Sequence, residues 1–242
     1  RAAWRDEIAK FMSTQPSLPI HPRWLTQQLR RAFPEETIFT IDGTQTQFWF
    51  YEEAFPFTMP RTLLPSTVFQ SMGCSFNMAI GANYVGVRAM TASSGGGFSL
   101  MAEALGLAGM VEVPLVVIEA QRAGPSTAMA TRTEQGDLLF LLHASQGEFL
   151  RIVMAPGTVE QCFACGWRAF NLAEKFQTPV IVVIDQYVAH FIRSADKGAL
   201  DFGAVRIDRG ALLTPAELDG LAEPYERYAI TPSGVSPRAV PG

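Results

Sequence analysis

The segment at residues 121–139, QRAGPSTAMATRTEQGDLL, combines residue types that can hold an anion. Arg122 can form a bidentate pair with a carboxylate, and Ser126 and Thr127 follow it as hydroxyl donors. The segment comes directly after the apolar run VPLVVIEA, which is typical of a buried strand. We therefore predict that Arg122, Ser126 and Thr127 bind an anionic substrate at the end of that strand.

A second candidate ligand-binding segment is SSGGG, residues 93–97, which lies between a predicted strand and a predicted helix. Its backbone N–H groups could face an anion or a polar ring. The segment matches neither of the common glycine-rich phosphate motifs, because no lysine or correctly spaced glycine follows it. A tight turn from strand to helix is the alternative interpretation.

Acidic residues near these segments have more than one possible role. Asp42 could hold a ligand hydroxyl or a metal, and we count it among the candidate cofactor-binding residues; it could also cap a turn. Asp185, at the end of another apolar run, has the same two interpretations. Glu119 or Glu134 could pair with Arg122 on the surface, which would make that arginine structural rather than ligand-binding.

The elements that must position these residues alternate regularly. Apolar, β-branched runs indicate strands over 37–42, 87–92, 114–120, 149–155 and 178–185. Helical spacing predicts helices over 2–12, 23–33, 72–86, 98–110, 134–144, 158–176 (with Thr158 as the cap) and 215–225. The aromatic-rich segment 44–67 is interpreted as a short helix plus a loop.

This alternation predicts an α/β fold whose parallel sheet is covered by helices on both faces, followed by an irregular C-terminal tail. Ligands of such sheets bind at the carboxyl ends of the strands. The segments IDGTQTQ, SSGGGFS and QRAGPST all follow predicted strands directly, so we expect them to converge on one site.

Composition excludes several classes of protein. Apolar residues make up 48% of the 242 residues and charged residues 17%, which is typical of a folded globular protein. The net charge of -4 argues against a nucleic-acid partner, and no apolar run is long enough to cross a membrane. Without a signal-peptide pattern, we expect a cytoplasmic protein. The three cysteines form no disulfide framework, and the C-x-x-C of Cys162 and Cys165 is interpreted as part of a helix.

From residue 77 to 242 the chain resembles the alpha subunit of a 2-oxoacid:ferredoxin oxidoreductase, most closely the 2-oxoglutarate type. The matching segments are NMAIGANYVGVRAMTASSGGGFSLMAEALGLAGM, QRAGPSTAMATRTEQGDLL, FNLAEKFQTPVIVVIDQY and the tail from VRIDRG to YAITPSGVSPRAVPG. The resemblance implies a thiamine diphosphate-binding fold, with Arg122 on the substrate carboxylate. It also implies that Ser94, Gly95 and Gly97 lie near the aminopyrimidine of the cofactor.

Residues 1–76 resemble a different protein class, the entry to the diphosphate-binding domain of acetolactate-synthase-like thiamine enzymes. The two resemblances together predict one composite domain over 1–200, joined near 77–82, and a C-terminal extension or linker over 201–242. The oxidoreductase family has an acidic cluster upstream of its NMAIGA helix. The corresponding FQSMGCSFNMAIGA has no carboxylate, so the resemblance assigns no catalytic residue.

The resemblance implies a subunit that takes part in oxidative decarboxylation of a 2-oxoacid, such as 2-oxoglutarate, to its acyl-coenzyme A. Thiamine diphosphate would be shared with a beta-type partner subunit that carries the magnesium and the iron–sulfur cluster, within an oligomer that reduces ferredoxin. Two alternatives stay open at this point. One is a non-redox carboligase or decarboxylase of the acetolactate synthase type, and the other is a non-catalytic interaction domain.

Overall fold

The computed structural model describes residues 22–41, 63–65, 73–125, 129, 132–190, 192 and 194–241. The chain divides into two compact units, Arg1–Ser75 and Phe76–Gly242. The helix predicted over 2–12 lies outside the described residues. The predicted division into a domain over 1–200 and an extension over 201–242 stays a prediction.

The first unit contains one helix and two short strands among its described residues. Helix α2 spans Pro22–Ala32, and strand β1 (Phe39–Ile41) pairs in parallel with β2 (Leu63–Pro65). Ile41 is buried there, against Leu29, Phe39 and Leu63. The interpretation of residues 44–67 as a helix and a loop is therefore wrong at β2, because this backbone pairs with β1 and Leu63 packs against Ile41.

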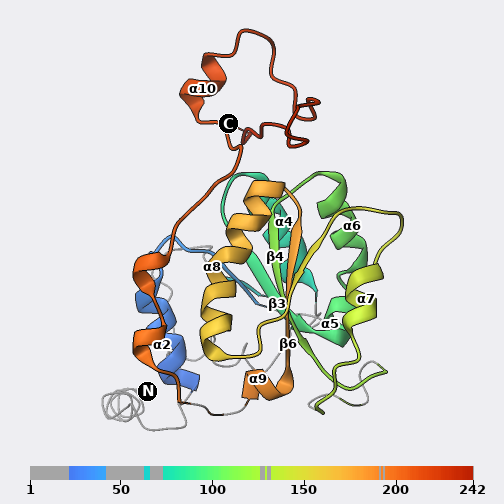
Figure 1. Ribbon diagram of the computed structural model, residues 1–242, viewed down its shortest axis with the longest axis vertical. Coiled ribbons are helices and arrows are strands. Elements are labelled where there is room, and N and C mark those ends of the chain that lie inside the picture. The colour runs from blue at the N-terminus through green and yellow to red at the C-terminus, as the bar shows by residue number, and fades with distance from the viewer. Residues whose placement is uncertain are drawn as a thin grey trace. The chain divides into compact units, whose positions relative to one another are not determined.

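The second unit is built on a four-stranded parallel sheet (Figure 1). Its strands lie in the order β3-β4-β6-β5, and their bounds are Met90–Ser94 (β3), Leu115–Gln121 (β4), Ile152–Met154 (β5) and Pro179–Asp185 (β6). In the register of the sheet, Ser94 pairs with Ala120, and Gln121 pairs with Asp185. The predicted parallel sheet is confirmed for these four strands, and β3, β4 and β6 end side by side at one edge. The strand predicted over 37–42 is not part of it, because β1 pairs with β2 in a separate sheet.

Helices cover both faces of this sheet, as predicted. Helix α8 packs on one face, and α4 to α7 lie on the other (Figure 1). The bounds are Cys74–Tyr84 (α4), Gly95–Ser99 (α5), Ala102–Met110 (α6), Leu138–His143 (α7), Val159–Phe176 (α8) and Gln186–His190 (α9). Thr158 caps α8 by accepting a hydrogen bond from the Gln161 N–H, which confirms the predicted start of that helix.

The central strand β4 shows why the sheet is buried on both faces. Successive side chains of a strand point to opposite faces. Leu115 and Val117 pack in the cluster formed with α4 to α7, whereas Val116 packs with Ala169 and Ala173 of α8. The same alternation places Glu119 on the face that carries Leu115 and Val117, with no solvent exposure.

The SSGGG segment is not the predicted loop. Ser93 and Ser94 end β3, and the next three residues form the first turn of α5. Ser94 has extended dihedral angles (φ -126, ψ 175) and serves as the N-cap residue, so the strand passes directly into the helix. The single helix predicted over 98–110 is also divided, because α5 ends at Ser99 and α6 begins at Ala102.

The C-terminal tail is irregular, as predicted, with three short helical segments. They are the 3-10 helices Lys197–Ala199 (η1) and Phe202–Ala204 (η2) and the helix Pro215–Asp219 (α10). Thr214 and Glu217 form a capping box at the start of α10. The helix predicted over 215–225 is shorter than expected, because Gly220 stands at its C-cap.

A buried ion cluster holds this tail against the rest of the second unit. Glu174 of α8 is 3% exposed and meets Arg88 (3.6 Å), Arg209 (3.1 Å) and Arg238 (2.9 Å). Arg238 also donates to the Asn83 carbonyl, at 3.1 Å. Burial lowers the pKa of Arg88 and Arg238, and the charge of Glu174 opposes that effect. We call these four ionised residues the Glu174 cluster.

Candidate functional site

The carboxyl edge of the sheet brings the two predicted ligand-binding segments together. Arg122 follows β4 directly, and Gly95 follows β3 directly. The two strands are hydrogen-bonded neighbours, so their ends lie side by side. We call Gly95, Glu119, Arg122 and Asp137 the carboxyl-edge site. This convergence of the β3 and β4 ends is the arrangement that a parallel sheet uses for ligand binding.

Asp137 connects the ends of these two strands. Its Oδ2 accepts a hydrogen bond from the Arg122 backbone N–H at 3.3 Å, and its own N–H donates to the Gln121 Oε1 at 3.2 Å. A Cβ atom on Gly95 would lie 2.6 Å from each carboxylate oxygen of Asp137. A side chain at position 95 would therefore displace the Asp137 carboxylate that accepts the Arg122 N–H bond.

The segment that leads to Asp137 also contacts the end of β6. Gln135 Nε2 donates to Asp185 Oδ2 at 2.7 Å, and Asp185 Oδ1 accepts from the Val188 N–H at 2.8 Å. Thr133 Oγ1 donates to Gln186 Oε1 at 3.2 Å. Asp185 thus has a structural role in the observed geometry, since it links this segment to α9 at the end of β6.

Glu119 is the most unusual group of the site. It is 0% exposed, and neither carboxyl oxygen has a hydrogen-bond partner within the described part of the chain. Burial, followed by the charge of Asp137 and a carboxyl–carboxyl hydrogen bond with Asp137 that needs a proton, raises the pKa of Glu119 to about 8, and the charge of Arg122 opposes this rise. The alternative in which Glu119 pairs with Arg122 on the surface is therefore wrong for this residue.

Sequence reasoning missed Glu119 and Asp137, although a signal was present for each. Glu119 follows Leu115 and Val117 at intervals of two, which is the spacing of one face of a strand. Asp137 immediately precedes the apolar run of α7, where acidic residues commonly stand.

The other predicted site residues have different outcomes. Ser94 and Gly97 are at the β3–α5 junction beside Gly95, Ser94 partly buried and Gly97 buried. Ser126, Thr127 and Asp42 lie outside the described residues.

The cysteines and the metal-binding residue types form no further site in the described ranges. Cys162 and Cys165 lie on α8, as predicted, and both thiols are free. No group of three or more histidine, cysteine, aspartate or glutamate side chains suited to a metal ion is found among the residues that the structure describes. No helix in those residues combines the length and the apolar character needed to span a membrane.

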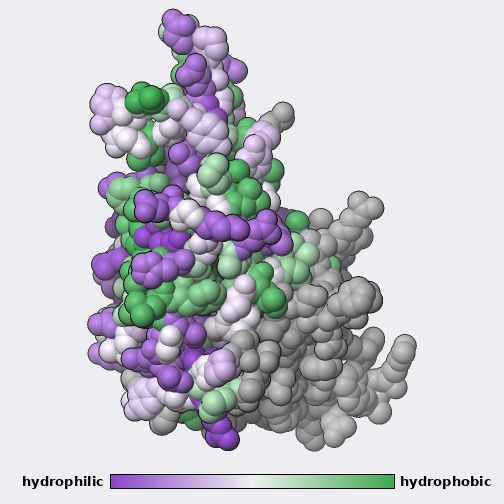
Figure 2. Space-filling view, turned by 90° about the vertical axis from the view of Figure 1, so that its right-hand side faces the viewer, coloured by the Kyte–Doolittle hydropathy of each residue, from purple (hydrophilic) through white to green (hydrophobic). Residues whose placement is uncertain are grey.

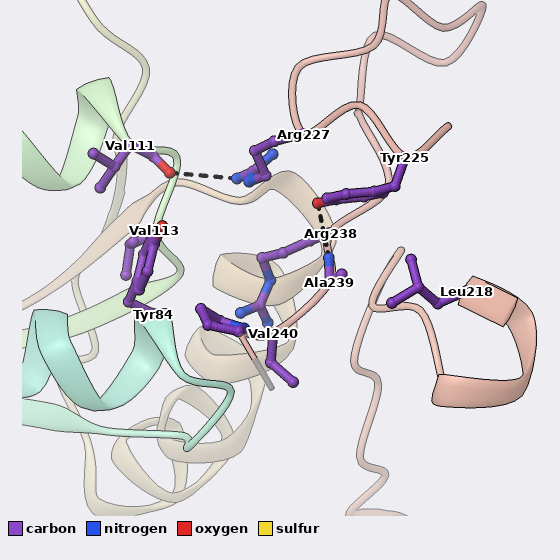
Figure 3. A pocket seen from close by; sticks show the side chains of 10 residues that line it. Tyr84, Val111, Val113, Leu218, Tyr225, Arg227, Arg238, Ala239 and Val240 are labelled. Carbon is purple, nitrogen blue, oxygen red and sulfur yellow. Dashed lines mark hydrogen bonds between the residues drawn. The ribbon is translucent and has the colours of Figure 1, made fainter. Parts of the chain in front are cut away.

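A cavity of about 300 Å³ lies at the opposite, amino-terminal edge of the sheet (Figure 3). The α6–β4 connection contributes Val111 and Val113, α4 contributes Tyr84, and the C-terminal tail forms the remainder. Arg227 Nη2 donates to the Val111 carbonyl at 3.3 Å, and the Ala239 N–H donates to the Tyr225 hydroxyl at 2.9 Å (Figure 3). The first bond joins the tail to the sheet edge that is remote from Arg122, and the second joins two parts of the tail.

Comparison with known proteins relates residues 67–208 to one family model, described as pyruvate flavodoxin/ferredoxin oxidoreductase, thiamine diphosphate-binding. A relative from Sulfurisphaera tokodaii, 2-oxoacid:ferredoxin oxidoreductase 1, subunit alpha, is 44% identical over 69% of this chain and 26% of its own length. The 2-oxoglutarate synthase subunit KorA of Methanothermobacter marburgensis is 46% identical over 46% of this chain and 30% of its own length. The chain thus spans roughly a quarter of the length of the curated relatives it matches.

A solved structure extends the likeness to the fold. The 2-oxoglutarate:ferredoxin oxidoreductase from Magnetococcus marinus, with 2-oxoglutarate, coenzyme A and succinyl-CoA bound, matches with a TM-score of 0.64 and 29% identity. The match covers 91% of this chain and 36% of that chain. The resemblance of residues 1–76 to acetolactate-synthase-like enzymes stays a prediction.

Proposed function

The chain belongs to the pyruvate flavodoxin/ferredoxin oxidoreductase family, in its thiamine diphosphate-binding part, and from this membership we propose that it forms part of a 2-oxoacid:ferredoxin oxidoreductase. The proposed reaction is the oxidative decarboxylation of a 2-oxoacid, such as 2-oxoglutarate, to its acyl-coenzyme A. The relatives named for 2-oxoacids and for 2-oxoglutarate support this substrate class.

One observation of the structure supports the proposal most directly. Asp137 accepts a hydrogen bond from the Arg122 backbone and lies against Gly95. The arginine proposed for the substrate carboxylate is therefore fixed beside the glycine turn proposed for the cofactor. Among the described residues, the Arg122 guanidinium makes no hydrogen bond or ion pair, which leaves its donors for a carboxylate ligand.

The same geometry fits the aminopyrimidine part of thiamine diphosphate. Ser94, Gly95 and Gly97 lie at the turn from β3 into α5, and Gly95 has no side chain between its backbone and the Asp137 carboxylate. The Glu119 carboxyl has no protein partner in the described ranges, and a polar ring is the kind of group that such a carboxyl can bind. When bound, thiamine diphosphate supplies the electron sink that a 2-oxoacid needs to lose carbon dioxide. Ser94, Gly95, Gly97 and Asp42 are the residues that we propose for holding it.

We propose a beta-type partner subunit that completes the site and carries the magnesium and the iron–sulfur cluster, with ferredoxin as the electron acceptor of the complex. Exposed apolar side chains on α5 to α7 and their connections support such a partner, since large apolar patches commonly mark interfaces. Figure 2, which views this side, shows hydrophobic residues gathered between hydrophilic ones. The most exposed are Leu100 (66%), Leu107 (52%), Met110 (79%) and Leu139 (72%).

We also propose a cytoplasmic location. The three free thiols support it, because a reducing compartment keeps cysteines unpaired. The division into a domain over 1–200 and an extension over 201–242 is part of the same proposal.

The proposal is tested with the chain co-expressed with a beta-type partner subunit and supplied with thiamine diphosphate, magnesium and coenzyme A. Adding 2-oxoglutarate should reduce ferredoxin, and Arg122→Ala should raise KM about 100-fold, since a charged hydrogen-bonding group contributes about 1.5–3 kcal/mol. Arg168→Ala, an exposed arginine on α8, is the matched control and should leave KM unchanged. Carbon dioxide release that needs no electron acceptor would contradict the proposed reaction and favour a non-redox decarboxylase.

A further inference from the structure

The burial and the position of Glu119 indicate a role beyond contact with a polar ring. It lies on the central strand β4, paired in register with Ser93 of β3 and Val183 of β6. It is 0% exposed, and no N–H or O–H group in the described part of the chain donates to either carboxyl oxygen. The Asp137 side chain is close enough for a carboxyl–carboxyl hydrogen bond, which forms only while one of the two groups holds a proton. A buried carboxyl in this condition is costly as a charge and therefore retains its proton unless a nearby cation compensates.

Two charged groups act on Glu119 from the elements around it. Asp137, which precedes α7, raises its pKa, and Arg122, which follows β4, lowers it. With burial as the largest cause, the pKa of Glu119 reaches about 8. Helix α5 and strand β3 carry no charged side chain. Asp185, at the end of β6, is bonded to Gln135 and the Val188 N–H and is not a cause of the shift.

Arg122 is therefore shared between Glu119 and the ligand carboxylate. When a carboxylate binds Arg122, it takes up the positive charge that favours ionised Glu119. It also adds a negative charge near the two carboxyl groups of Glu119 and Asp137. Both effects favour the protonated form of Glu119, and by reciprocity the protonated form favours carboxylate binding.

We propose that Glu119 is a specificity-determining and positioning residue, which must hold a proton for a 2-oxoacid carboxylate to bind Arg122. This inference rests on the proposed function, because that function names the carboxylate ligand. In the coupled step a proton from solvent binds one Glu119 carboxyl oxygen as the ligand carboxylate pairs with the guanidinium. No other bond forms or breaks. The affinity for the carboxylate then falls as the pH rises through the range in which Glu119 ionises.

The test is calorimetric binding of 2-oxoglutarate to the complex with its partner subunit, from about pH 6 to about pH 9.5, in two buffers of different ionisation enthalpy. We expect the wild-type affinity to fall by up to about tenfold per pH unit above pH ~8, with proton uptake on binding. Glu119→Gln, which has the shape of the protonated acid, should bind with an affinity that does not vary with pH. Glu103→Gln, an exposed glutamate on α6, is the matched control and should retain the wild-type profile.

A second variant keeps the test decisive if Glu119→Gln does not fold. Asp137→Asn retains an oxygen acceptor for the Arg122 N–H but removes the charge that raises the Glu119 pKa, so the midpoint of the profile should move to lower pH. A Glu119→Gln or Asp137→Asn complex with the wild-type profile overturns the coupling. Wild-type binding that is independent of pH also overturns the coupling alone. Failure of the wild type to bind 2-oxoglutarate at every pH overturns both the proposed function and the coupling.

Discussion

Glu119 and Glu174 are both almost completely buried glutamates, 0% and 3% exposed, and their surroundings are opposite. Glu174 meets three arginines, one of them at 2.9 Å. Glu119 has an aspartate as its strongest charged neighbour and, in the described ranges, no hydrogen bond to either carboxyl oxygen. Removing one partner from a buried ion cluster destabilises a fold because it leaves uncompensated charge, whereas a buried carboxyl with a raised pKa is a candidate functional group.

The two edges of the sheet differ in the same way as these two glutamates. The Glu174 cluster and the tail are bound near the amino-terminal edge, through bonds such as that of Arg238 to the Asn83 carbonyl. The carboxyl-edge site leaves the Arg122 side chain and the Glu119 oxygens without protein partners in the described part of the chain. One edge is closed by charge pairing, and the other has polar groups that only a ligand or a proton satisfies.

The largest effect on stability is expected from removing the negative charge of the Glu174 cluster. Glu174→Gln leaves three buried or half-buried arginines with no negative partner, so it should lower the free energy of unfolding by about 3–5 kcal/mol. Urea denaturation followed by circular dichroism measures this change. A loss below about 1 kcal/mol would show that the cluster is not structural.

The raised pKa of Glu119 predicts that the stability of the protein depends on pH. The folded-state pKa of Glu119, about 8, lies above its ordinary value, so the folded state binds more protons than the unfolded state between pH ~5 and pH ~8. The free energy of unfolding should therefore fall as pH rises through this window, with Glu119 contributing up to about 1.4 kcal/mol per pH unit.

Glu119→Gln removes this contribution, so its stability should vary less with pH than that of the wild type. Denaturation midpoints across the same pH window measure the difference. Parallel pH profiles for the two proteins would show that Glu119 is ionised in the folded state at neutral pH.

A smaller effect is expected where the tail backbone approaches the Glu174 cluster. Gly210 has φ +57, and a Cβ atom there would collide with the Glu174 carbonyl oxygen and lie 2.8 Å from the Lys175 Cα. Gly210→Ala should therefore cost about 1–3 kcal/mol of stability. Gly166→Ala, on an open part of α8, is the control and should instead stabilise the protein by up to about 1 kcal/mol. Equal results for the two variants would contradict the close approach of the tail.

The smallest effect is expected at an ion pair near solvent, which can be compared with the buried Glu174 cluster. Glu112 pairs with Arg227 at 3.0 Å, and its side chain is 42% exposed. Glu112→Gln should cost about 0.2–1 kcal/mol, and the cost should shrink at high salt. Thermal melts at low and high ionic strength provide the measurement. A cost close to that of Glu174→Gln would mean that burial does not set the difference between the two pairs.

Strongly patterned elements were predictable from the sequence because their burial is periodic. The strands β4 and β6 and the helix α8 each begin and end within a residue or two of their predicted bounds. The glycines of SSGGG were misjudged as a loop because glycine has a low helix propensity. At Gly95 the missing side chain leaves room for the Asp137 carboxylate, and that contact arises only when two distant segments meet.

The role of a charged residue was harder to predict than the helix or strand in which it lies. Glu174 is one of several charged residues in the last turns of α8, and its partners Arg88, Arg209 and Arg238 are spread along the chain. No local pattern identifies such a cluster. Glu119 could have been recognised, because it stands in phase with the core residues of β4, but its lack of partners is a property of the three-dimensional structure alone.

The bond from Arg238 to the Asn83 carbonyl joins residues that are 155 positions apart, and this has a consequence for biosynthesis. Closing so long a loop is slow compared with forming the local helices and the sheet. During translation, α4 and α8 emerge well before Arg238, so Glu174 lacks one of its cations and Tyr84 and Val113 lack their cover. Until the tail is synthesised, the amino-terminal edge of the sheet stays uncovered in the nascent chain, and exposed apolar surface of this kind favours aggregation.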